Sequence, residues 1–224
     1  LGGSGSINGM IYVRGQPSDY NHWAQLGNLG WGYDDVLTYF SRSEKRIGDN
    51  SSGVHGRDGG VPVTDMDWIN PISEAFIQTA EEHGHSRNPD YNSGTQEGVG
   101  YFQRAISRGL RVSSARGILR PALKNKNIKL ILNARVTKIL FDGKTAKSIK
   151  LVRARNNEPT TITARKEIIV SAGAINTPRL LQVSGLGSKN YLNDLGVDTV
   201  KNIEGVGNNL IDHYGARMVM KANP

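Results

Sequence analysis

The stretch Leu1-Gly2-Gly3-Ser4-Gly5-Ser6-Ile7-Asn8-Gly9-Met10 opens the chain and is rich in glycine, small hydroxyl and amide groups. Glycine has no Cβ, so a main chain that contains it can adopt positive φ angles and lie close to a ligand. The side chain of Asn8 supplies both a hydrogen-bond donor and an acceptor. The stretch therefore predicts a backbone turn that packs against a flat, polar ligand.

A second segment of small residues, Ser171-Ala172-Gly173-Ala174, lies far along the chain. The apolar run at 167–171 is expected to be a short strand whose carboxyl end leads into Ala172-Gly173, and Thr177-Pro178 is expected to start a helix that ends at Ser184-Gly185. Open α/β sheets bind ligands at the carboxyl ends of their strands. The Ala172-Gly173 turn is therefore a candidate ligand contact, with room for the adenosine-pyrophosphate side of a dinucleotide.

Both segments resemble signatures of the glucose-methanol-choline (GMC) flavoprotein oxidoreductases. The first continues through Tyr12, Gly15 and Asn21 as the family's first signature does, and the second matches the family's second signature as far as Gly187. The run Gly-Val-Gly-Asn-Asn-Leu-Ile-Asp-His at 205–213 is similar to the run that follows in the family. The resemblance implies a mixed α/β fold (α+β): an FAD-binding, three-layer ββα-type flavin domain that is incomplete and is interrupted by part of an antiparallel-sheet substrate domain.

The resemblance also implies a division of the chain. Residues 1–65 would carry the flavin-contacting motif and an extension of the FAD domain, and residues 66–108 would be part of the substrate domain. The central portion of the FAD domain would follow at 109–214, and 215–224 would begin a second substrate-domain segment. On this interpretation the chain is a central fragment of a longer enzyme.

The implied cofactor is FAD, and the residues expected to hold it come from three places in the sequence. The residues of the opening stretch would lie along the flavin and its pyrophosphate-ribityl arm. The main chain of Val136 would contact the adenine, although a strand valine equally suits core packing. Some relatives attach the flavin through a histidine just before the matching asparagine, and Ile7 stands in that place here. Non-covalent binding is therefore expected. The full set of candidate cofactor contacts is Gly3, Ser4, Asn8, Gly9, Met10, Val136, Ala172 and Gly173.

No catalytic residue is expected within this chain. Asp212-His213 could pair for proton transfer, but neighbours on an extended strand point to opposite faces, so His213 is at most a neighbour of the active site. The family's proton-accepting histidine comes from a later segment, and no G-x-G-x-x-G followed by a ribose-binding acid occurs here. We therefore expect this chain to be inactive by itself. Choline-specific relatives carry a carboxylate where Gly215 stands, which argues against choline.

The function implied by the resemblance is oxidation of a small alcohol, with hydride passing from the CH–OH carbon to flavin N5. The expected partners are the alcohol, the remaining parts of the parent chain, and oxygen or a quinone-like carrier as electron acceptor. One alternative is a hydroxynitrile lyase of the same family, which holds FAD without net redox chemistry. Another is a non-catalytic or nucleic-acid-binding basic module.

Composition limits these alternatives. The 224 residues carry a formal net charge of +8, but lysine and arginine are scattered rather than clustered, which argues against a nucleic-acid partner. Cysteine is absent, which excludes disulfides and thiolate metal sites and favours a reducing, cytoplasmic location. No metal site is expected. No apolar run reaches the roughly 18 residues that a transmembrane helix needs.

Periodicity predicts the local elements. Helices are expected at Tyr33–Glu44, at Ile72–His83 after an Asn70-Pro71 cap, and in a short or bent form from Ser113 or Ser114 to Leu123. The loop Ile47–Gly60 is expected to be exposed, with His55 on the surface. An Asp142-Gly143 turn predicts a hairpin. Strands are expected at Val99–Ile106, Ile128–Leu132, Val136–Phe141, Ala146–Arg153 and Thr160–Arg165.

Overall fold

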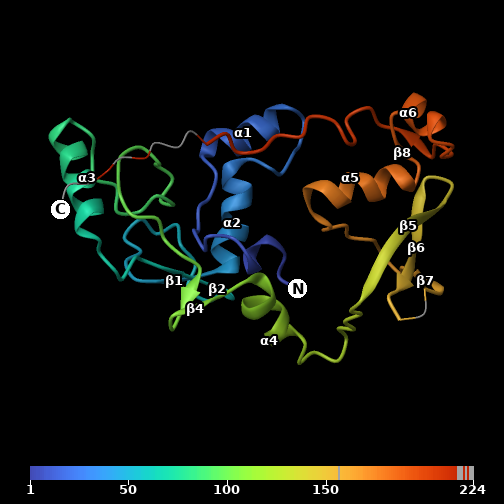
Figure 1. Ribbon diagram of the computed structural model, residues 1–224, viewed down its shortest axis with the longest axis horizontal. Coiled ribbons are helices and arrows are strands. Elements are labelled where there is room, and N and C mark those ends of the chain that lie inside the picture. The colour runs from blue at the N-terminus through green and yellow to red at the C-terminus, as the bar shows by residue number, and fades with distance from the viewer. Residues whose placement is uncertain (156, 216–218, 220, 222–224) are drawn as a thin grey trace. The chain divides into compact units, whose positions relative to one another are not determined.

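The computed structural model describes residues 1–155, 157–215, 219 and 221. Its contacts divide the chain into two compact units, Leu1–Lys129 and Leu130–Pro224. Helices and small sheets alternate within both units (Figure 1), which confirms the predicted mixed α/β fold. The expected substrate-domain segment at 66–108 falls inside the first unit and stays a prediction. Most of the expected segment at 215–224 lies outside the described residues.

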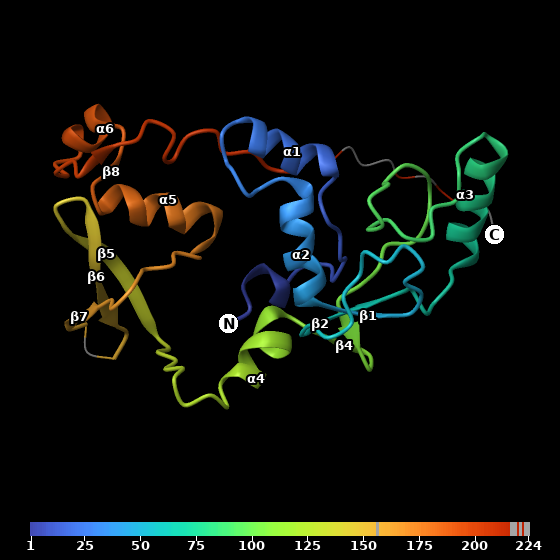
Figure 2. The same cartoon turned by 180° about the vertical axis from the view of Figure 1, so that it is seen from behind.

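The first unit combines helices with two small two-stranded sheets. Strands β1 and β2 pair in parallel, and β3 and β4 form an antiparallel hairpin. Helices α1 and α2 pack against each other and are seen side by side in both Figure 1 and Figure 2. In chain order the elements are η1 (Gly3–Ser6), α1 (Pro17–Gln25), α2 (Tyr33–Ser43), β1 (Glu44–Ile47), β2 (Val61–Thr64), α3 (Pro71–Glu82), β3 (Ile106–Ser107), β4 (Leu110–Arg111), η2 (Ala115–Leu119) and α4 (Arg120–Ala122).

The three predicted helices of this unit are confirmed. In α2, the Asp35 carboxylate accepts the Gly32 N–H, which caps the helix where the sequence places acids. In α3, the Asn70 side chain accepts the Ile72 N–H, as an N-cap residue does. The third helix is short and begins as a π-helical turn at Ala115, in agreement with the expected bend.

Helix α1 and strand β1 are among the elements that were not predicted from the sequence. Helix α1 begins with Pro17, and Asp19 accepts the Gln16 N–H, so a local start signal was present. Strand β1 buries Glu44 and Arg46 and exposes the residues that alternate with them. Its inward side is charged, so hydrophobic alternation could not reveal it.

The strand expected at Val99–Ile106 is wrong for most of its length. Only isolated bridges occur there, from Val99 to Arg87 and from Arg104 to Ile11 and Thr64, and the ladder proper begins at Ile106. The apolar and aromatic composition was correct for an extended segment. A regular strand also needs one continuous partner, and three different segments share this one.

The second unit is built around a long antiparallel hairpin. Its turn lies at Asp142-Gly143, where Gly143 has a φ of 56°, as the sequence predicts. The third strand extends the sheet in the order β5-β6-β7, and α5 packs beside β5 (Figure 2). The elements are β5 (Ala134–Asp142), β6 (Thr145–Arg153), β7 (Pro159–Thr163), α5 (Gly173–Val183), β8 (Leu186–Gly187), α6 (Lys189–Asp194) and β9 (Lys201–Asn202).

Three predictions in this region are wrong. The segments 128–132 and 167–171 are not strands, because no described segment pairs with them. Helix α5 begins at Gly173 rather than at Thr177-Pro178. Pro178 inside the helix removes one intrahelical hydrogen bond, to the carbonyl of Ala174, while the Thr177 hydroxyl accepts the Ala172 N–H and closes the preceding turn.

The core of the second unit is small, and Leu192 of α6 has no exposed surface. Buried Ile139 and Leu151 face inward from neighbouring strands β5 and β6. Buried Ser184 accepts the Ile139 N–H at 2.8 Å and donates to the Leu180 carbonyl, which joins β5 to the end of α5.

We expect Leu192→Ala to lower the free energy of unfolding of this unit by about 2–5 kcal/mol, because it removes buried methyl groups and leaves a cavity. Leu195→Ala, at the end of the same helix, is the matched control, since Leu195 is 58% exposed. Urea denaturation followed by circular dichroism measures both. Equal losses for the two variants would contradict the assigned core.

Candidate functional site

The opening stretch folds into a tight turn. The carbonyl of Ser4 accepts the N–H groups of Ile7 and Asn8 at 3.0 and 2.8 Å. Gly2 and Gly3 have φ angles of 98° and 56°, and a Cβ at Gly2 would lie 2.8 Å from the Ser113 hydroxyl oxygen. The positive φ angles therefore require glycine at both positions, and close packing against Ser113 also requires it at Gly2.

The predicted contact residues of this turn lie on its open side. Gly3, Ser4, Asn8 and Gly9 are exposed and Met10 is half-buried. A Cβ added to Gly3 or Gly9 would meet no atom within 4 Å. The turn thus presents backbone and an amide side chain to open space, as a surface that receives a flat ligand would. Whether these residues contact a cofactor stays a prediction.

A network of hydrogen bonds holds the segment that follows the turn. Ala105 donates its N–H to the Met10 carbonyl at 2.8 Å, and the Tyr12 N–H donates to the Gln103 carbonyl at 2.8 Å. The Asn92 side chain spans the next residues: its Nδ2 donates to the Tyr12 carbonyl and its Oδ1 accepts the Arg14 N–H at 2.7 Å. Residues 92–105 therefore clamp the chain directly after the candidate ligand contacts.

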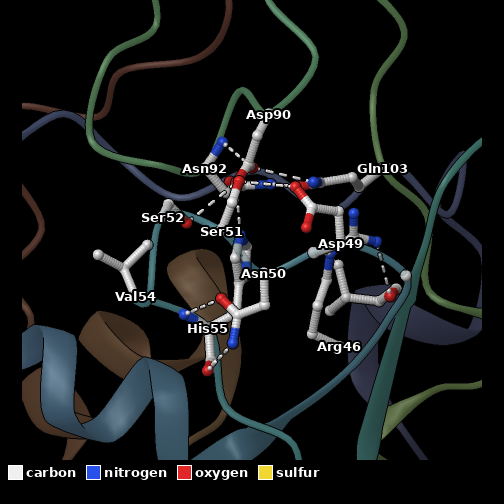
Figure 3. Close-up of polar contacts among 12 residues, drawn as sticks. Arg46, Asp49, Asn50, Ser51, Ser52, Val54, His55, Asp90, Asn92 and Gln103 are labelled. Atoms are coloured by element: carbon white, nitrogen blue, oxygen red, sulfur yellow. Dashed lines mark hydrogen bonds and ion pairs between the residues drawn. The ribbon is translucent and has the colours of Figure 1, made fainter.

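Behind this clamp lies a buried cluster of charged side chains, which we call the ion cluster: Arg14, Glu44, His55 and Asp90. Arg14 lies 2.8 Å from the Glu44 carboxylate. The His55 ring is held on both sides, with Nδ1 at 2.7 Å from Glu44 and Nε2 at 2.9 Å from Asp90. Figure 3 shows His55 and Asp90, with Gln103 donating to the second oxygen of Asp90. The expectation of a surface histidine is wrong, because the His55 side chain is completely buried.

The neighbouring charges decide the protonation of the ion cluster. Burial would lower the pKa of His55, but its bonds to Asp90 and Glu44 outweigh burial and raise this pKa to about 9. Burial would raise the pKa of Asp90, but the bonds from His55 and Gln103 lower it to about 2. The pKa of Glu44 is likewise held below its ordinary value, against burial, by His55 and Arg14. At neutral pH the cluster thus contains two cations and two anions, which balance.

In the second unit, two residues predicted from separate segments come together. Val136 and Ala172 line one cavity of about 420 Å³ between β5 and the start of α5. The strand register shifts between Val136 and Lys138, beside the cavity, where a β-bulge re-aims side chains. The remaining lining residues are Arg135, Thr137, Asn176, Arg179, Leu180 and Val183.

This cavity combines an apolar wall with positive charge. Val136, Leu180 and Val183 supply the wall, and Arg135 and Arg179 supply two guanidinium groups. The cavity also lies next to the amino-terminal end of α5, where unpaired backbone N–H groups and the helix dipole favour anions. Such a site suits a ligand that joins a flat apolar ring to a phosphate. The predicted contact Gly173 starts the helix with a φ of 86°.

Sequence reasoning missed the charged members of this cavity. Asn176 and Arg179 lie one turn apart on α5, so their common face could have been inferred once the helix start was known. The start was misplaced at Thr177, and that error hid the pattern. The sequence pattern could not place Arg135 in the cavity, because the alternation of residues along β5 shows only which face of the strand Arg135 lies on.

The third motif packs on the other side of the same helix. Gln182 of α5 donates to the Val206 carbonyl at 3.1 Å, and a second cavity of about 620 Å³ is lined by α5 and residues 205–211. The pair Asp212-His213 is fully exposed, and its side chains are 3.9 Å apart, beyond hydrogen-bond distance. Asp212 instead accepts the His213 backbone N–H at 2.8 Å.

A comparison with known families shows which family the chain belongs to. A family model described as GMC oxidoreductase matches residues 1–215. The chain belongs to the GMC oxidoreductase family. Both cavities and the opening turn lie within the matched region. None of the described helices has the length and apolar character needed to cross a membrane.

Two GMC relatives illustrate how much of such a protein this chain represents. The oxygen-dependent choline dehydrogenase of Brucella ovis is 42% identical over 213 residues, which is 95% of this chain and 38% of that protein. The enzyme of the same name from Rhizobium etli is 41% identical over 213 residues, again 95% of this chain and 38% of that protein. The chain therefore spans a little over a third of the length of these relatives.

Solved structures agree with this assignment. The pyridoxine 4-oxidase from Mesorbium loti superimposes with a TM-score of 0.82 at 30% identity, covering 90% of this chain and 39% of that one. An FAD-dependent oxidoreductase from Chaetomium thermophilum gives a TM-score of 0.84 at 30% identity, covering 90% and 37%. The sequence and the structural comparisons thus agree on the GMC fold.

The ion cluster generates a pH dependence of stability. Because the folded-state pKa of His55, about 9, exceeds the ordinary 6.5, its contribution is complete below pH 6.5 and is lost as the pH rises through 9. The pKa of Asp90, lowered to about 2, gives a contribution that is lost as the pH falls towards 2. We therefore expect the free energy of unfolding to fall between pH 6.5 and 9, by at most about 1.4 kcal/mol per pH unit.

Chemical denaturation at a series of pH values checks this expectation. His55→Gln should remove the decline above pH 6.5 as well as lowering stability throughout. The exposed His85 is the matched control, and His85→Gln should keep the wild-type decline. A His55→Gln variant with an unchanged slope would show that another group is responsible.

Proposed function

We propose that this chain forms part of an FAD-dependent oxidoreductase that acts on the CH–OH group of an alcohol. The observation that carries the proposal is the cavity in which Val136 and Ala172 meet beside Arg135 and Arg179. Membership of the GMC family supports it. The chain covers 38% of the relatives' length, so the activity proposed is that of the protein to which this segment contributes.

The residues present fit a dinucleotide. An adenine ring needs an apolar wall, and Val136, Leu180 and Val183 provide one. A pyrophosphate needs cations or helix N–H groups, which the two arginines and the start of α5 provide. In the first unit, the turn Gly3–Met10 exposes backbone at Gly3 and Gly9, where a Cβ would meet no atom within 4 Å. These two surfaces would hold the adenosine and the flavin portions, respectively.

When bound, FAD supplies the acceptor for a hydride removed from the alcohol carbon. The residues of this chain bind and orient. The opening turn would fix the position of the reactive ring against the substrate, and positioning of that kind accounts for much of the rate in such reactions. The base that takes the alcohol proton is not assigned to any residue described here.

The substrate proposed is a small alcohol, and the relatives suggest two to test. Their names specify choline and pyridoxine, whereas Gly215 in place of a carboxylate disfavours choline. The word oxygen-dependent in the names of the choline dehydrogenases favours oxygen as acceptor, ahead of a quinone-like carrier. The other candidate of this family, a hydroxynitrile lyase, rests on the same cofactor-binding features.

The product of the complete reading frame that contains this chain should be purified and mixed anaerobically with choline, pyridoxine or benzyl alcohol. We expect bound oxidised flavin, and loss of its visible absorbance with at least one alcohol, because hydride transfer reduces it. A bound flavin that stays oxidised with all alcohols while cyanohydrins are cleaved would favour the lyase. Absence of flavin after reconstitution with FAD would refute the proposal.

The cavity gives a second test. Arg179→Met removes a cation from the lining and keeps the length of the side chain, so we expect the dissociation constant for FAD to rise at least about tenfold. Arg165→Met, an exposed arginine of the same unit outside the cavity, is the control. Equilibrium dialysis of the two apoproteins with FAD measures the constants. Equal affinities would place the adenosine portion elsewhere.

A further inference from the structure

Arg111 reaches the opening turn from a distant part of the sequence. It lies on β4, directly after the hairpin turn in which Arg108 and Gly109 have φ angles of 50° and 69°. Its Nη1 donates to the Gly5 carbonyl at 3.3 Å and to Asn8 Oδ1 at 2.8 Å. The guanidinium therefore ties the two ends of the turn to each other.

These contacts fix the orientation of the Asn8 amide. The Met10 N–H donates to the same oxygen at 3.0 Å. Both groups that contact this atom are hydrogen-bond donors, so the atom must be the amide oxygen. In the flipped orientation, the amide NH₂ group would face two N–H donors without an acceptor. No described residue accepts a hydrogen bond from the Nδ2 group of this amide. Asn8 is exposed, so this donor is free for a ligand.

The residues after Arg111 support the underside of the turn. The Ser114 hydroxyl donates to the Gly2 carbonyl at 3.4 Å. The Ser113 Cα lies 3.7 Å from the position of a Cβ on Gly5. Residues 111–114 thus form a floor, and the side of the turn that faces away from this floor is the one that carries the exposed glycines.

No described carboxylate forms an ion pair with Arg111. Among the described residues, none of the ion pairs includes Arg111, and its two acceptors are a carbonyl and an amide oxygen. A cation with neutral partners at an exposed turn favours an anionic or strongly polar ligand nearby.

From this geometry we propose that Arg111 is a positioning residue of the cofactor site: it locks the Asn8 amide so that Nδ2 donates a hydrogen bond to the bound FAD. The inference rests on the proposed function, since FAD is its ligand. Arg111 acts through Asn8 and through the shape of the turn, and it needs no contact with the cofactor itself.

The test compares three variants of the full-length protein for FAD affinity. Arg111→Met removes the donor and should raise the dissociation constant about tenfold, the scale of one lost charge-assisted hydrogen bond. Arg111→Lys restores one donor to Asn8 and should recover part of that loss. Arg108→Met, in the turn of the same hairpin, makes no contact with Asn8 and should stay within about twofold of wild type. Thermal melting confirms that all three are folded.

Two further readouts separate positioning from general support. In the apoprotein, hydrogen–deuterium exchange of the peptide 3–10 should be faster in Arg111→Met and unchanged in Arg108→Met. Asn8→Asp keeps an acceptor for both Arg111 and Met10 but removes the Nδ2 donor. It should therefore keep slow exchange and yet bind FAD about tenfold more weakly.

The outcomes distinguish this inference from the proposed function. If wild type binds FAD and Arg111→Met binds it as tightly as Arg108→Met, the positioning role is wrong and the proposed function stands. If Asn8→Asp binds FAD as tightly as wild type, the proposed hydrogen bond from Nδ2 to FAD is wrong. If wild type binds no FAD, the proposed function fails first and the role of Arg111 fails with it. Hydrogen–deuterium exchange is measured in the apoprotein and so does not depend on FAD binding. Unchanged exchange of the peptide 3–10 in Arg111→Met would show that Arg111 does not hold the turn.

Discussion

The structure of the first unit depends on the ion cluster. Its four members come from four places in the sequence: the segment after the opening turn, the start of β1, the following loop, and Asp90, two residues before the clamp at 92–105. Removing one partner of a buried pair leaves an uncompensated charge, which typically costs about 3–5 kcal/mol. Glu44 contacts both Arg14 and His55, and His55 also contacts Asp90, so the full set of pairs forms only when all four segments meet. The ion cluster therefore specifies which loops pack together.

That specification determines the geometry of the candidate site. The chain from Met10 to Arg14 runs between the exposed turn and the ion cluster, so a turn built of flexible glycines is held at its far end by buried bonds. Within the turn, Arg111 of β4 holds both Gly5 and Asn8. In the second unit α5 has the equivalent role, because it contacts the bulged strand on one side and the Gly205–Ile211 run on the other. Each surface is thus held in place by segments that are distant in the sequence.

Local elements could be predicted wherever their signals lie within a few residues of one another. The Asn70-Pro71 cap and the Asp142-Gly143 turn act through neighbouring backbone groups, so both formed as expected. The segments at 128–132 and 167–171 have the composition of strands, yet a strand also requires partner N–H and C=O groups, which composition does not specify. Strand β1 was missed for the opposite reason, since its inward residues Glu44 and Arg46 are charged.

By itself, the sequence determined the family, through three ordered motifs, and the local elements whose caps and turns are encoded nearby. Only the tertiary structure decided that His55 is buried, that Arg111 holds Asn8, and that Arg135 and Arg179 line the cavity with Val136. The physical reason is the same in each case. A charged side chain is stable in the interior or in a cavity only through partners or ligands that lie far away in the chain, and their proximity is a property of the fold.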